Sequence, residues 1–296
     1  MMVVRKWVRV CMLVGVSFFA TLYTTPQAFA NDTRSIQARW VSAISADNTS
    51  VLRELLEESE ENSNSTADAQ PLWELGSSNG KTALMVASKV GDVALAEQLV
   101  ALGSNIKVRT ITNGTAFMFA VLGDQQPIAQ WLLGLGASIN AKGSNGWTGV
   151  MIASAKGLDK TLEWLLSEGA NPQTPDVYGF SPLMRAADNG HTDAVRMLLN
   201  QAKSNNNTGG GGIDVHWQDE LENTALHYAV AGNHKEIVEL LLSAEASLKT
   251  RNKAGLSALD LATNAVNAEK ASGSNPLLQQ KRQELLDTLQ RFKQSG

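Results

Sequence analysis

Apolar and polar positions recur along most of the chain with a period of 33 residues. Each period opens with a hydroxyl residue, and these residues are Thr82, Thr115, Thr148, Ser181, Thr224 and Ser257. An alanine stands five residues after each hydroxyl, and a leucine stands seventeen residues after each of the first five. Only the interval between Ser181 and Thr224 is longer, at 43 residues. Three columns in one register indicate an internal repeat.

Each period predicts two helices joined by a tight turn. The hydroxyl suits the N-cap of the first helix, and the small alanine lets a neighbouring helix pack closely. Gly91, Gly157 and Gly190 suit the turn between the helices, because a positive φ costs glycine least. The second helix then presents leucine pairs, such as Leu132 and Leu133, on one stripe.

A second turn precedes each hydroxyl. Glycine occupies it in four of the periods, as Gly80, Gly146, Gly179 and Gly255. Asn113 stands there once, and asparagine tolerates the left-handed conformation better than most residues. Glu222 stands there in the fifth period, where we expect local strain or an altered turn geometry.

The segments "TALHYAVAGNHKEIVELLLSAEASL" and "SPLMRAADNGHTDAVRMLL" resemble the ankyrin repeat, and the resemblance covers about residues 77 to 262. It implies an all-α ankyrin-repeat solenoid of stacked helix-turn-helix units, with β-hairpin fingers leading into each first helix and helical caps at both ends. We therefore expect five ankyrin repeats over residues 77–252. Because one unit cannot bury its own apolar stripe, the interfaces between units should supply most of the stability.

Both ends of the repeat region predict caps. Residues 31–76 read as a degenerate N-terminal capping repeat followed by an acidic polar loop, with an inner stripe of Trp40, Ile44, Leu52, Leu55 and Leu56. Residues 253–296 read as a C-terminal sixth or capping repeat. Its last helix should start at Pro276 and face inward with Leu278, Leu285, Leu286 and Leu289. Lys281, Arg282 and Gln283 should face outward.

The longer interval contains a ten-residue insertion near residues 203–212, within "NQAKSNNNTGGGGIDVHW". The register is intact on both sides, so the segment is not a domain linker. A phosphate loop is also excluded, since no lysine-serine pair follows the glycines. A tolerated surface insertion is the first interpretation, because lengthening a connection costs little closure entropy. The alternative is that the insertion contacts a partner.

Residues 1–30 have the form of a signal peptide: a basic start, a short apolar run and Ala28-Phe29-Ala30 as the cleavage motif. The run is shorter than a membrane span requires, although an uncleaved anchor is the alternative. We expect cleavage after Ala30, a periplasmic or secreted protein, and no membrane insertion afterwards. Cys11 is the only cysteine, so the processed chain has no disulfide or thiolate chemistry.

The formal net charge is −4, and it becomes more negative when the basic leader is removed. A mildly acidic protein is a poor general binder of nucleic acid. No zinc or G-x-S-x-G motif is present. Asp176 and Asp219 are interpreted as caps of finger turns. We expect no metal, no cofactor, no catalytic residue and no enzymatic activity.

The repeat register accounts for three of the histidines of the processed chain. His227 falls in the column that bonds within the repeat scaffold, where the earlier repeats have methionine. His191 and His234 occupy matching turn positions, and His216 lies outside the register. None of the four is a candidate ligand.

The resemblance implies that the chain binds another protein with its finger tips and exposed first-helix faces. Large aromatic residues and arginine there suit a binding hot spot. The candidate protein-binding residues are Trp147, Lys156, Tyr178, Phe180, Arg185, Asp188, Asn189 and Leu221. The alternative is that Trp147 and Phe180 only pack between adjacent fingers.

We therefore expect a monomeric, exported, non-catalytic scaffold for a periplasmic protein partner. A second hypothesis is an inhibitor or immunity protein that neutralises a periplasm-acting toxin enzyme. A third is a stress-protective accessory protein. The sequence does not separate them, because a solenoid recognises its partner through many small contacts.

Overall fold

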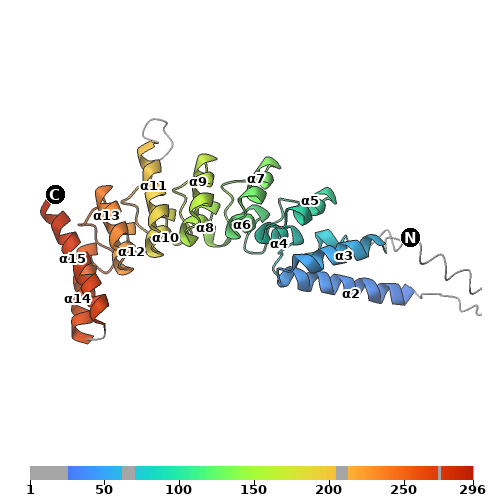
Figure 1. The fold of residues 1–296 in the computed structure, drawn as a ribbon, viewed down its shortest axis with the longest axis horizontal. Coiled ribbons are helices and arrows are strands. Elements are labelled where there is room, and N and C mark those ends of the chain that lie inside the picture. Colours follow the sequence, from blue (N-terminus) through green and yellow to red (C-terminus); the bar gives the residue numbers. More distant parts are fainter. Residues whose placement is uncertain (1–25, 62–70, 205–212, 273–274, 296) are drawn as a thin grey trace, which may run out of the picture.

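The structure is a computed structural model, and it describes residues 26–61, 71–204, 213–272 and 275–295. Its helices stack in chain order along one long axis, from α2 at one end to α15 at the other (Figure 1). The fold is an all-α repeat solenoid, as the 33-residue period predicts.

Each repeat supplies one helix to an inner row and one to an outer row. The first helices are α4 (Ala83–Val90), α6 (Ala116–Leu122), α8 (Gly149–Lys156), α10 (Pro182–Asp188) and α12 (Ala225–Ala231). The second helices are α5 (Val93–Ala101), α7 (Gln126–Gly134), α9 (Asp159–Ser167), α11 (Thr192–Ser204) and α13 (Lys235–Ser243). Repeats one to five are these five pairs, and the first helices pack against one another in sequence.

The alanine and leucine columns form the core. The first helices bury their alanines completely, at Ala87, Ala120 and Ala153. The second helices bury leucines completely, such as Leu132 and Leu165. Burying one leucine stabilises the fold by about 1.5–3 kcal/mol. Every repeat buries such residues against its neighbours, so the interfaces between repeats stabilise the stack.

The predicted hydroxyl caps are confirmed in repeats one to four. The side chain of Thr148, for example, accepts a hydrogen bond from Met151 N at 3.3 Å. Repeat five uses a different arrangement, in which the ring of His227 supplies the cap. Its Nδ1 lies 3.1 Å from Thr224 N and 2.8 Å from the Thr224 hydroxyl.

The finger turns have the expected left-handed residue in every repeat. The residues are Gly80, Asn113, Gly146, Gly179, Glu222 and Gly255, with φ between 60° and 82°. The expected strain at Glu222 is present, because a side chain at a φ of 60° is disfavoured. A second left-handed residue separates the two helices of each unit, and Asp47 occupies this position in the N-terminal cap.

The fingers are tight turns, not the β-hairpins that the resemblance implies. In the described parts of the chain, strand pairing is limited to two isolated antiparallel bridges, Gly76 with Thr82 and Arg251 with Ser257. The glycine-type turn closes each finger within a few residues, which leaves no length for a ladder. Single backbone bonds join neighbouring fingers instead, such as Val177 N to Asn145 O at 2.8 Å.

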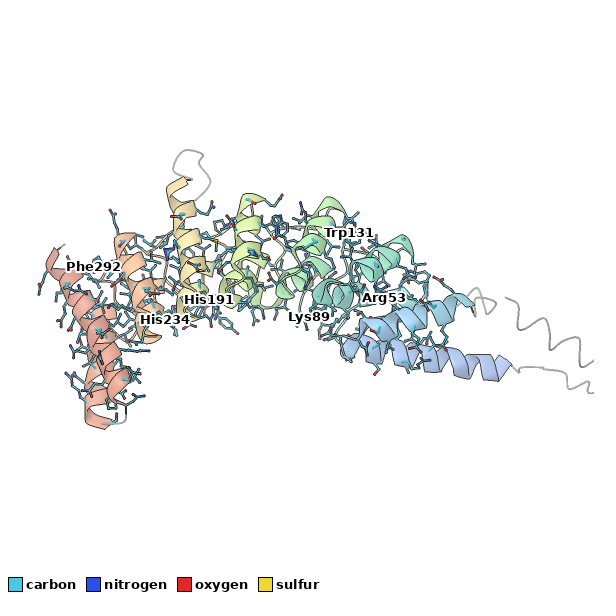
Figure 2. The ribbon with its side chains drawn as sticks, viewed as in Figure 1. Arg53, Lys89, Trp131, His191, His234 and Phe292 are labelled. Atoms are coloured by element: carbon cyan, nitrogen blue, oxygen red, sulfur yellow. The ribbon has the colours of Figure 1, made fainter. Side chains whose placement is uncertain are left out.

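The N-terminal cap consists of α2 (Pro26–Ser45) and α3 (Thr49–Glu61). The inner stripe of Trp40, Ile44, Leu52, Leu55 and Leu56 is buried, as predicted. Ion pairs hold the cap on repeat one. Asp47 accepts from Lys81 and from Lys89, and Arg53 pairs with Asp92. Arg53 and Lys89 are labelled at this junction in Figure 2.

The C-terminal cap consists of α14 (Ala258–Ser272) and α15 (Pro276–Ser295). Leu285, Leu286 and Leu289 are buried as expected, while Leu278 is half-buried. The outward orientation expected for Arg282 is wrong. Its Nη1 donates to Glu269 Oε2 at 2.9 Å, and the Glu269 side chain is 7% exposed, so the guanidinium lies between α14 and α15.

The insertion begins inside α11, which has 13 residues where α9 and α13 have 9. Lys203 and Ser204 belong to this helix, while residues 205–212 lie outside the described residues. The signal peptide expected over residues 1–30 also lies mostly outside them, and the motif at 28–30 falls in the first turns of α2. In the described part, no helix is long and apolar enough to span a bilayer.

Candidate protein-binding site

A hollow of about 420 Å³ follows the fingers and first helices of repeats one to four. Its floor is apolar. Met118, Phe119 and Leu122 come from α6, and Ile152 comes from α8. Trp147, on the finger of repeat three, lines one wall. An apolar concave surface that crosses several repeats is a suitable place for a ligand.

Polar groups surround this floor. The finger residues that line the hollow are Asn79, Thr110, Thr112, Ser144 and Asn145. Lys156, at the end of α8, and Arg185, on α10, are the charged residues of the lining. Tyr178 completes it on the finger of repeat four.

Two glycines lie in close contact with residues of the floor. Gly114 precedes the cap of α6, where a Cβ would lie 3.2 Å from Phe119 Cε2. Gly143 begins the finger of repeat three, where a Cβ would overlap Met118 Cε. Asp176 begins the finger of repeat four at the matching position. A side chain at either glycine would therefore displace Phe119 or Met118 in the floor of the hollow.

Asp176 closes the hollow through a buried ion pair with Arg185. Its carboxylate is 0% exposed and accepts from Arg185 Nη2 at 2.6 Å. The same carboxylate accepts from the backbone N–H groups of Tyr178 and Phe180, both at 2.9 Å. Thus one aspartate fixes the turn of the finger and the position of the arginine beneath it.

Arg185 also lies against two aromatic rings. Its Cζ is 3.8 Å from the centroid of the Phe180 ring and 5.2 Å from that of the Trp147 ring. Both distances allow a cation–π attraction. The aromatic and cationic groups of repeats three and four therefore form one rigid cluster.

Repeat five has tyrosine where repeat four has arginine. The Tyr228 hydroxyl donates to Asp219 Oδ2, and the Tyr228 ring lies 4.9 Å from the Phe180 ring. Burial and the bond to Asp219 raise the pKa of Tyr228 far above its usual value of 10. The phenol therefore stays protonated and acts as a fixed hydrogen-bond donor.

Sequence models of ankyrin repeats match most of the chain. One model, of three copies, matches residues 40–143 and 117–209, and a second, of many copies, matches residues 207–262. The chain belongs to the ankyrin repeat family. A search of curated proteins gave no significant match. Ankyrin repeats are in general protein–protein interaction modules, and the hollow occupies the face of the stack formed by the fingers and first helices.

Four of the eight candidate residues line the hollow, namely Trp147, Lys156, Tyr178 and Arg185. The other four lie beside it. The Phe180 ring is half-buried between Arg185 of α10 and Tyr228 of α12. Leu221 is 59% exposed on the finger of repeat five. Asp188 and Asn189 are exposed at the end of α10.

The hollow extends to repeats one and two, where none of the eight candidate residues lies. The floor residues Phe119 and Ile152 occupy the same column as Arg185, and their apolar character was the available signal. The exposed finger residues Ile111 and Val177 also share a column and were missed. Gly143 gave a further signal, because it breaks the aspartate pattern of the later fingers.

The rings of His191, His227 and His234 bond within the repeat scaffold, whereas His216 is exposed. The Nε2 atoms of His191 and His234 lie 3.0 and 3.2 Å from the carbonyl oxygens of Ala155 and Asp188, in the preceding repeats. His191 and His234 occupy matching positions in neighbouring repeats, and both are labelled in Figure 2. Burial lowers the pKa of His227 below its usual value. Within the described residues, His, Cys, Asp and Glu form no group of three or more suited to a metal ion.

Proposed function

We propose that the chain is a non-catalytic scaffold that holds one partner protein in this hollow. The observation that carries the proposal is the continuous apolar floor that crosses from repeat two to repeat three. Phe119 is half-buried and Ile152 is 7% exposed. Both residues line the hollow together with Met118 and Leu122.

The finger tips add exposed apolar surface next to this floor. Ile111 is 76% exposed, Val177 57%, Tyr178 51% and Leu221 59%. These residues lie on three fingers, those of repeats two, four and five. Exposed apolar residues that gather on one face of a protein favour a binding role for that face. A partner that covers the row would also cover the hollow.

The cluster around Arg185 favours binding in another way. The bond to Asp176 and the contacts with Phe180 and Trp147 already fix its side chain. Binding therefore costs little conformational entropy at this end of the hollow. Arginine and tryptophan are also the residue types that dominate binding energy in many interfaces.

Site-specific photo-crosslinking tests the proposal in cells that make the protein. A photoreactive phenylalanine analogue replaces Tyr178 in one variant and Leu277 in another. Leu277 is 62% exposed on α15, so it serves as a matched exposed apolar control. We expect a discrete protein adduct from position 178 and none from position 277. Equal adducts at both positions, or none at 178, would contradict the proposal.

A second variant checks that the surface drives this binding. Replacing Ile111 by Ser removes exposed apolar area without opening a cavity, so the melting temperature should not change. We expect a weaker adduct from position 178 in this background. An unchanged adduct would show that the partner does not use the finger row.

The proposal includes export. The basic start, apolar run and Ala28-Phe29-Ala30 motif support a cleaved signal peptide and a periplasmic location. N-terminal sequencing of the protein from cells should give Asn31 as the first residue. Recovery of a chain that begins at Met1 would contradict export by this route.

A further inference from the structure

The row of backbone bonds between fingers is interrupted at the hollow. Each neighbouring pair of fingers can share one bond, from an N–H of the later finger to a carbonyl of the earlier one. The four bonds present are Ile111 N to Asn79 O, Val177 N to Asn145 O, Glu220 N to Tyr178 O and Lys253 N to Leu221 O. The matching pair in repeats two and three is Thr112 O and Ser144 N, and the described residues contain no such bond between them.

The structure of the third finger explains the interruption. Ser144 begins a short 3-10 turn, Ser144–Gly146, in which its carbonyl accepts from Trp147 N at 3.0 Å. Arg109 spans the two repeats instead, and its Nη1 donates to Lys142 O at 3.1 Å. The backbone N–H of Ser144 and the carbonyl of Thr112 have no partner among the described residues.

Both free backbone groups lie at the lining of the hollow, since Thr112 and Ser144 are lining residues. A donor and an acceptor side by side suit an extended polypeptide, which carries a free N–H and a free C=O in every residue. A partner helix bonds these groups internally along most of its length. The interruption therefore favours a partner segment in extended form.

The charges of the lining favour an acidic segment. Lys156 and Arg185 are its charged members, and no acidic side chain lines the hollow. Arg185 already pairs with Asp176. Lys156 is exposed and has no hydrogen-bond or ion-pair partner in the described parts of the chain. An unpaired ammonium beside an apolar floor attracts a carboxylate.

We propose that the hollow binds an extended, acidic segment of a partner protein. The segment bonds to Thr112 O and Ser144 N through its backbone and covers Phe119 and Ile152 with an apolar side chain. An aspartate or glutamate close to that side chain pairs with Lys156. This inference rests on the proposed function and specifies the chemistry of the partner.

Random peptides displayed on phage provide the probe. We expect selection on the purified protein to enrich sequences with an apolar residue and one or more acidic residues close to it. A fluorescent copy of an enriched peptide then gives the dissociation constant. Lys156→Glu should weaken binding at least about tenfold, because it replaces attraction by repulsion. Lys160→Glu is the matched control, an exposed lysine on α9 outside the hollow, and should leave the constant unchanged.

A second variant tests the backbone contact. Ser144→Pro removes the free N–H, and proline suits the first position of a helical turn. We expect several-fold weaker peptide binding with an unchanged melting temperature. If binding is unaffected, the peptide does not use this N–H, and the extended arrangement is wrong.

The outcomes separate this inference from the proposed function. Peptides that bind the hollow but are enriched in basic residues, or that ignore Lys156→Glu, overturn the acidic segment and leave the scaffold function intact. Failure of any peptide to bind overturns the extended segment. If Tyr178 also gives no crosslinked adduct in cells, then the scaffold function falls with it.

Discussion

Replacing Asp176 by Ala should destabilise the protein by about 2–4 kcal/mol. The side chain is fully buried and accepts three hydrogen bonds, two from the backbone of its own finger and one from Arg185. Truncation leaves these donors without an acceptor. A hydrogen bond to a charged group contributes about 1.5–3 kcal/mol, and losing one partner of a buried ion pair costs about 3–5 kcal/mol.

The expected loss of stability is smaller than the sum of these figures for two structural reasons. The Arg185 side chain is 19% exposed, so it regains some hydration when its partner is lost. Its contacts with the rings of Phe180 and Trp147 also remain. Asp176→Asn should cost less, about half as much. Its amide oxygen can still accept from the finger N–H groups, although it loses the charge that pairs with Arg185.

Urea unfolding followed by circular dichroism measures the change in the free energy of unfolding. The slope of that free energy against urea should equal that of the unmodified protein, because a changed slope indicates partial unfolding of the stack. A loss below about 0.5 kcal/mol for Asp176→Ala, within the usual range of surface substitutions, would refute the reasoning. So would an equal loss for both substitutions, since the ion pair would then contribute nothing.

Three other substitutions, one of them with a matched control, test separate parts of the fold. His227→Met installs the residue of the earlier repeats. Burial lowers the folded-state pKa of His227, so the unfolded chain takes up the proton first, and stability falls as the pH drops through about 6.5. Urea titrations at pH 7.5 and 5.5 measure how far the free energy of unfolding falls between the two pH values. This fall should be smaller in the variant than in the unmodified protein, by up to about 1.4 kcal/mol, and an equal fall in both would contradict the prediction. Glu222→Gly should stabilise by up to about 1 kcal/mol by relieving the positive φ, and a lower melting temperature would contradict it. Leu165→Ala should cost about 2–5 kcal/mol, whereas Leu135→Ala, 42% exposed, should change stability by less than about 0.5 kcal/mol.

The sequence predicts the stack well because its contacts are between neighbouring repeats. Residues one period apart in the sequence, such as Ala87, Ala120 and Ala153, are buried at equivalent places in neighbouring repeats. The sequence period therefore predicts the packing directly. The N-terminal cap was recognisable from its apolar stripe, but its turn was not. Asp47 takes the place that Gly91 takes in repeat one, and the ion pairs that it makes with Lys81 and Lys89 are absent from the repeat pattern.

The candidate site was only partly predictable. Columns identify the residues that share a row, and they identified Trp147, Tyr178 and Arg185. They do not reveal which part of the row is hollow, because that depends on how side chains such as Phe119 and Met118 pack against Gly114 and Gly143. The interrupted bond between two fingers is likewise a matter of backbone conformation, and no residue type in the repeat specifies it.

The two glycines of the hollow have a consequence for how this protein tolerates mutation. Substitutions that remove side-chain atoms damage the core, whereas substitutions that add a side chain damage the hollow. A single substitution that gives Gly114 or Gly143 a side chain places atoms against Phe119 or Met118 while the leucine and alanine columns stay intact. We therefore expect a variant with side chains at both positions to remain folded but to lose binding of the proposed partner.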